Sequence, residues 1–291
     1  MLRRSFLKGL VASLVVGFLG MRKVGAQGWN GYVFRHGVAS GDPDDNSVIL
    51  WTRVSGATSR PIRVRWEVAS DPEMKKVLRH GEAWASDAHD YTVKVEARRL
   101  KAGRTYYYRF SVYGAASEVG RTKTLPRGRV SRARFAVVSC SNHPYGFFHA
   151  YREIAGRDDL DAVIHLGDYI YEYGLGEYAT EMAETLGRIP EPLTELRSLA
   201  DYRLRHAQYK ADADSRAMHA RHPLIAVWDD HELVNDTWQT GALEHGEDDG
   251  DFATRIDAAV RAYFEWMPIR GTADGVKTSI FRSFRYGNLL K

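Results

Sequence analysis

The chain has 291 residues, of which 44% are hydrophobic and 27% are charged, a globular composition that excludes a disordered or fibrous protein. The formal net charge is +4, but residues 1–26 hold five cations and no acid, so the rest of the chain has a formal net charge of −1. Net charge therefore gives no signal for nucleic-acid binding.

Residues 1–26 have the features of an export signal. Arg3 and Arg4 open the segment, residues 9–20 are mostly apolar, and small residues ending at Ala26 form a cleavage sequence. The apolar stretch has about the length of a signal-peptide core and is short for a membrane span. The paired arginines resemble a twin-arginine signal. We expect export by the twin-arginine machinery to the periplasm or the cell exterior, with no stable membrane anchor after cleavage; an amphipathic first helix is the alternative.

Residues 28–126 are predicted to form an all-β domain, with room for about seven strands. Residues 48–52, 62–68 and 91–95 are short and rich in β-branched or aromatic residues, and the last two alternate with period two. Residues 100–108 resemble the tyrosine corner of a fibronectin type III-like sandwich, in which a tyrosine hydroxyl bonds back to the nearby backbone.

Strands and helices are predicted to alternate after a polar linker at residues 125–132, so residues 133–291 are predicted to form an α/β domain. The predicted buried strands are residues 135–139, 162–166 and 224–228. The predicted helices are residues 145–157, 194–220 and 252–266, and residues 281–286 are predicted to begin a further β element.

Polar side chains follow each of the three predicted buried strands. Cys140 follows the first, Asp168 and Tyr171 follow the second, and Asp230 and His231 follow the third. Ligands bind at the carboxyl ends of the strands in open α/β sheets, so we expect these side chains to meet. Thiol, carboxylate, phenol and imidazole groups together indicate a metal site.

The motifs that carry these side chains resemble those of the PhoD-like alkaline phosphatase family, within the metallophosphoesterase superfamily. Asp168 and Tyr171 match its G-D-x-x-Y motif. Residues 228–232, W-D-D-H-E, lie where purple-acid-type members carry G-N-H-E, and Cys140 lies where the wider superfamily has the first Asp of D-x-H. Residues 34–43 resemble the family's N-terminal β-sandwich domain.

The resemblance implies a fold and a chemistry. The implied fold is a fibronectin type III-like β-sandwich followed by an α/β metallophosphoesterase domain. Ferric iron and calcium are the implied metals, and the ligand types also accept other divalent ions. The implied metal ligands are Cys140, Asp168, Tyr171 and Asp230. A hydroxide held by the metals would attack a phosphate monoester or diester, and His231 would protonate the leaving group.

The family takes further metal ligands from a later stretch of sequence. This chain has no histidine after His245 and no carboxylate after Asp274. We therefore expect an incomplete, C-terminally truncated metallophosphoesterase domain that binds metal poorly and turns over little. We also expect it to leave a strand edge and an apolar face exposed.

Plainer interpretations of the same residues stay open. Cys140 is the only cysteine, so it has no disulfide partner within the chain. Instead of binding metal, it could be a buried apolar residue or could form an intermolecular link. Tyr171 has a packing role as its alternative, Asp230 a helix-capping role, and His231 a structural one. Two other functions remain for the whole chain: a non-catalytic exported binding module with a degenerate α/β half, and a metallohydrolase of another ester.

Overall fold

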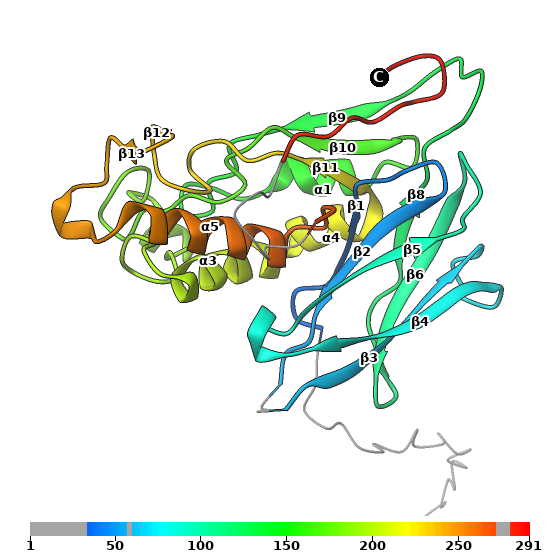
Figure 1. Ribbon diagram of the computed structural model, residues 1–291, viewed down its shortest axis with the longest axis horizontal. Coiled ribbons are helices and arrows are strands. Elements are labelled where there is room, and N and C mark those ends of the chain that lie inside the picture. Colours follow the sequence, from blue (N-terminus) through cyan, green and yellow to red (C-terminus); the bar gives the residue numbers. More distant parts are fainter. Residues whose placement is uncertain (1–33, 57–59, 272–279) are drawn as a thin grey trace, which may run out of the picture. The chain divides into compact units, whose positions relative to one another are not determined.

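Two large β-sheets and a layer of helices build the part of the chain that the computed structural model describes, residues 34–56, 60–271 and 280–291 (Figure 1). The predicted export signal lies outside these residues. No helix within them is long and apolar enough to cross a membrane.

The five-stranded sheet is antiparallel and comes entirely from the predicted all-β region. Its order is β4-β3-β6-β7, with β8 paired to β6. Its strands are β3 (Ile62–Ala69), β4 (Val77–Ala85), β6 (Thr105–Val112), β7 (Ala115–Ala116) and β8 (Gly120–Lys123). At the start of β6 the Tyr106 hydroxyl accepts from Lys101 N at 2.7 Å and lies 3.3 Å from Lys101 O, which is the bonding pattern of a tyrosine corner.

The six-stranded sheet joins both predicted domains, in the order β5-β2-β1-β11-β10-β9. Its N-terminal strands are β1 (Val38–Gly41), β2 (Ser47–Arg53) and β5 (Thr92–Arg98), and its later strands are β9 (Phe135–Val138), β10 (Ala162–His165) and β11 (Pro223–Ala226). β1 pairs antiparallel with β2 and parallel with β11, and β11, β10 and β9 are mutually parallel. The polar segment at 125–132 therefore connects two parts of the molecule that share one sheet.

Two hydrophobic cores cover the faces of the six-stranded sheet. Leu50 of β2, Val64 of β3 and Tyr108 of β6 are fully buried in one cluster, which fills the space between the two sheets. Val163 of β10 and Leu224 of β11 belong to the other cluster, which they form together with buried side chains of the helices. The helices are α1 (His149–Ala155), α2 (Ala183–Leu186), α3 (Leu199–Ala211), α4 (Ala213–Arg221) and α5 (Phe252–Trp266).

Three predicted elements differ from the structure. The predicted helix 194–220 is two helices, because Asp212 leaves the helical conformation and its Oδ1 caps α4 by accepting from Asp214 N and Ser215 N. The predicted helix 145–157 is helical only over α1. The predicted β element 281–286 forms no strand and has a single bridge, Tyr286 with Leu290. It contacts the neighbouring strand β9 through side chains, because the Tyr286 ring packs edge to face on Phe135 with 4.8 Å between the ring centroids.

The first predicted buried strand is only half buried. β9 is an edge strand of the six-stranded sheet, and the Val137 side chain is 59% exposed. Leu166, just after β10, is 52% exposed. Within the described residues β9 thus ends the sheet, and these two apolar side chains near it are exposed.

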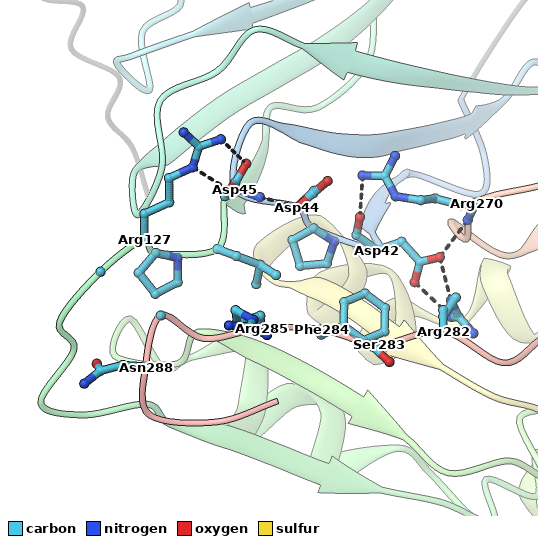
Figure 2. Close-up of a pocket in the computed structure, with 15 residues that line it drawn as sticks. Asp42, Asp44, Asp45, Arg127, Arg270, Arg282, Ser283, Phe284, Arg285 and Asn288 are labelled. Atoms are coloured by element: carbon cyan, nitrogen blue, oxygen red, sulfur yellow. Dashed lines mark hydrogen bonds and ion pairs between the residues drawn. The ribbon is translucent and has the colours of Figure 1, made fainter.

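A buried ion pair ties residues 280–291 to β1. The Asp42 carboxylate is fully buried and accepts two bonds from the Arg282 guanidinium, at 2.7 and 2.9 Å, and a third from Arg270 N at 2.7 Å. These residues line one side of a cavity of about 580 Å³ (Figure 2). A short two-stranded sheet, β12 (Thr237–Trp238) with β13 (Gly241–Ala242), completes the strands.

Candidate metal centre

The loops after β9, β10 and β11 meet at the carboxyl ends of these parallel strands, and Asp168 lies at their centre. The thiol of Cys140 and the hydroxyl of Tyr171 each donate to Asp168 Oδ2 at 3.3 Å. Asp168, Asp230 and His231 also offer ligand atoms that lie within 4.8 Å of one another. Asp168 thus belongs to two groups, one with Cys140 and Tyr171 and one with Asp230 and His231, and the structure brings all five predicted site residues together.

The chemistry of these side chains fits a cation at Asp168. Its Oδ1 atom is buried and has no hydrogen-bond partner among the described residues, although an unpartnered buried carboxylate oxygen is costly. Carboxylate oxygens suit calcium, while phenol, imidazole and thiol groups suit a transition metal such as iron. A cation beside Asp168 would satisfy the Oδ1 atom and displace the protons that Cys140 and Tyr171 direct at Oδ2.

Burial controls the protonation of Tyr171. Burial raises the pKa of the Tyr171 phenol, and the charge of Asp168 raises it further. The phenol therefore keeps its proton unless a cation offsets the local negative charge. Burial and the charges of Asp168 and Asp230 likewise raise the pKa of the Asp229 carboxyl above its ordinary value.

The loop backbone is held in conformations that few residues adopt. Cys140 has a φ of 57° and Asp168 a φ of 52°, both in the left-handed region that costs non-glycine residues energy. Cys140 N donates to Gly167 O at 3.2 Å, which joins the two loops. Gly167 has a φ of 109°, and a Cβ atom there would lie 2.5 Å from Asp229 N, so only glycine fits between the loops after β10 and β11.

Asp230 also takes part in the structure of its own loop. Its Oδ1 accepts from His231 N at 3.0 Å and its Oδ2 accepts from Asp236 N at 2.6 Å. Each oxygen keeps a second lone pair, so the loop-holding role and a ligand role are compatible. The helix-capping alternative for Asp230 is wrong, because no helix starts directly after it in the described residues and its side chain holds a turn instead.

Glu232 is a supporting residue to which sequence reasoning gave no role. Its carboxyl is fully buried and accepts from three backbone amides, Asp168 N at 3.0 Å, Tyr169 N at 2.6 Å and Asp229 N at 2.9 Å. Burial raises the pKa of Glu232 to about 8, and the amide donors oppose part of that rise because they stabilise the carboxylate. Glu232 thereby fixes the loop of Asp168 to the loop of Asp230.

Glu172 orients His231 in a similar way. The Nδ1 atom of His231 lies 2.9 Å from Glu172 Oε2, and Glu172 Oε1 accepts from Asn235 N at 2.6 Å. Burial lowers the pKa of His231, but the hydrogen bond and charge of Glu172 outweigh it, so the pKa lies above its ordinary value. The sequence signal for both residues is an acid directly after each motif, Glu172 after Tyr171 and Glu232 after His231, and it does not show which groups they contact.

The segment that carries Tyr171 is also held from α3. Arg205 is fully buried, and its guanidinium donates to Tyr171 O and, at 2.9 Å, to Tyr173 O. Arg203 on the same helix instead pairs with Glu265 at 2.7 Å. Arg205 therefore supports the site through the backbone, while Arg203 serves packing elsewhere. The cavity of Figure 2 shares no lining residue with the metal centre.

Comparison with known proteins gives one family. The family described as "PhoD-like phosphatase" matches residues 135–291, and "PhoD-like phosphatase, N-terminal domain" matches residues 21–126. The chain is 39% identical over 306 aligned positions to alkaline phosphatase D of Bacillus subtilis (strain 168), covering 99% of this chain and 52% of that protein. A solved structure titled "Structure of PhoD" superposes with a TM-score of 0.82 at 40% identity, covering 91% of this chain and 52% of that one. The chain thus spans about half the length of both relatives, and it belongs to the PhoD-like phosphatase family.

Proposed function

We propose that this chain is part of an exported, metal-dependent phosphoesterase that hydrolyses phosphate monoesters, diesters or both. The observation that carries the proposal is Asp168, whose Oδ1 has no partner while its Oδ2 receives a thiol and a phenol hydrogen bond. Similarity to an alkaline phosphatase supports the reaction class. Cys140, Asp168, Tyr171 and Asp230 are the residues we assign to metal binding, with ferric iron and calcium as the metals.

The bound metals would supply charge neutralisation for a phosphoryl group and lower the pKa of a water. Asp168 is suited to touch two metals because its two oxygens face different neighbours: Oδ2 faces Cys140 and Tyr171, and Oδ1 is unpartnered. Asp230 and His231 lie on the far loop, within reach of the same carboxylate. The strained backbone keeps these side chains in place before the substrate arrives.

We assign to His231 the delivery of a proton to the leaving group. Its Nδ1 faces the Glu172 carboxylate at 2.9 Å, so Nδ1 carries a proton and the ring orientation is fixed. In the protonated ring, Nε2 carries the proton that can be transferred. A leaving alkoxide that takes this proton departs as a neutral alcohol, and Glu172 stabilises the imidazolium beforehand.

Phosphate release from one monoester and one diester, with iron and calcium supplied, tests the proposal. We expect Asp168→Ala to abolish turnover. Asp158→Ala is the matched control, because this exposed carboxylate precedes β10 at the opposite end of the strand. Turnover that survives Asp168→Ala would refute the assignment. In a chain extended beyond Lys291, metal binding without phosphate release would instead favour a hydrolase of another ester, and no metal binding would favour a binding module.

Export by the twin-arginine machinery is a separate part of the proposal. It rests on Arg3 and Arg4 and on the apolar stretch that follows them. In cells, replacement of both arginines by lysine should leave the protein inside with its first 26 residues uncleaved. Unchanged export of that variant would exclude this route.

A further inference from the structure

A groove of about 870 Å³ on the five-stranded sheet is lined by cations. It lies between β4, the turn joining β5 to β6, and the strands β6 and β8. Five of its lining residues are basic and none is acidic. The five cations are Arg79, Arg99, Lys101, Arg104 and Lys123. A concave surface lined by charges of one sign concentrates ions of the opposite sign.

One of these cations is held rigidly and has no carboxylate partner in the described parts of the chain. The Arg79 guanidinium donates to three backbone carbonyls, Arg98 O at 3.2 Å, Leu78 O at 2.6 Å and Arg99 O at 2.5 Å. These bonds fix the position of the charge without neutralising it. An arginine fixed in this way loses little side-chain entropy when an anion binds.

Three further cations have no partner within the described residues. Arg99, Lys101 and Arg104 are exposed, and their side chains form no ion pair or hydrogen bond with the described part of the chain. Lys123 differs, because it pairs with the Asp161 carboxylate. The groove therefore has four cations that no carboxylate of residues 34–56, 60–271 and 280–291 neutralises.

We propose that this groove binds a linear polyanion that carries phosphate groups and no bases. Guanidinium groups match phosphate oxygens in a two-pronged geometry, and a hollow of this size admits a chain more readily than a flat membrane surface. Sites for single-stranded nucleic acid add exposed aromatic rings on which bases stack. Among the described residues, the only aromatic side chain that lines this groove is Tyr106, which is 4% exposed and whose hydroxyl accepts from the Lys101 backbone amide. The groove shares no lining residue with the metal centre, so the inference stands without the proposed reaction.

The test is binding of a short linear polyphosphate, measured by calorimetry in Asp168→Ala protein with no metal added. We expect the combined variant Arg99→Gln, Lys101→Gln and Arg104→Gln to weaken binding on the order of 10- to 100-fold. The slope of log affinity against log salt concentration should become shallower by about 2, because three phosphate contacts are lost. A variant with Arg99→Lys and Arg104→Lys keeps the charges and should retain most of the affinity.

The matched control removes three other exposed arginines, with the changes Arg65→Gln, Arg129→Gln and Arg132→Gln. This control has the same net charge as the groove variant, and we expect near-unchanged affinity. Equal weakening by both variants would overturn the proposal, because net charge alone would then explain binding. Tighter binding of a single-stranded oligonucleotide of equal charge would also overturn it. So would a protein that binds anionic lipid vesicles through Arg99 and Arg104 but does not bind polyphosphate.

Discussion

Replacement of Glu232 by glutamine should loosen the candidate metal centre without changing a residue that we assign to metal binding. The glutamine oxygen can take the place of Oε2 and still accept from Asp168 N and Asp229 N, but its NH2 group then faces Tyr169 N, which loses its acceptor at 2.6 Å. A buried amide left without a partner costs about 1–3 kcal/mol of stability. Because the same bonds position Asp168, we expect metal affinity to fall by about 10- to 100-fold, as for other residues that orient metal ligands.

Urea unfolding gives the change in stability, and titration with calcium and with iron at alkaline pH, above the pKa of Glu232, gives the change in affinity. Glu265→Gln is the matched control, because this buried carboxylate holds Arg203 and Arg261 and contacts no residue of the metal centre. We expect the control to lose a similar free energy of unfolding and to keep its metal affinity. Unchanged metal affinity in Glu232→Gln, or an equal loss in both variants, would refute the positioning role.

Three further changes test other parts of the structure. Gly167→Ala should cost several kcal/mol in urea unfolding, because its Cβ would meet Asp229 N at 2.5 Å, whereas Gly128→Ala, with positive φ but open space, should cost only about 1 kcal/mol. Tyr106→Phe should cost about 1–3 kcal/mol, because Lys101 N loses its acceptor. Burial lowers the pKa of His206 from 6.5 to about 3, so the unfolded chain binds this proton at a higher pH than the folded chain does. The free energy of unfolding of the wild type should therefore fall by roughly 2 kcal/mol more than that of His206→Phe when the pH is lowered from 8 to about 5. Parallel pH profiles of the two proteins would contradict this.

The sequence pattern predicted correctly those helices whose ends are determined by neighbouring residues in the sequence. Helix α5 has the predicted bounds, because Asp251 caps its start by accepting from Thr254 N and Pro268 follows its end. The split at Asp212 was missed because its capping role appears only when the chain turns there. Residues 281–286 alternate like a strand, but a strand also needs a partner, and alternation carries no information about what lies beside it.

The motif spacing located the five predicted site residues at strand ends, and the structure brings them together there, while their roles as ligands and as general acid stay predictions. The roles of Glu172 and Glu232 were not predictable in the same way. Each accepts from groups on a loop about 60 residues away, and those groups point at the carboxylates only because the intervening chain folds back. A buried acid beside a ligand motif indicates support of this kind but does not name its partners.

The continuity of the six-stranded sheet makes the N-terminal strands part of the structure that holds the site. β11, which leads into the loop of Asp230, pairs with β10 on one side and with β1 on the other. The close approach to β1 depends on Gly41, where a Cβ atom would lie 2.3 Å from Pro268 O and 2.7 Å from Leu224 O. A bulkier residue at Gly41 would push β1 away from β11 and from the segment after α5. The N-terminal strands therefore constrain the loop after β11 through direct strand pairing, and a disturbance of β1 reaches Asp230 through β11 and this loop.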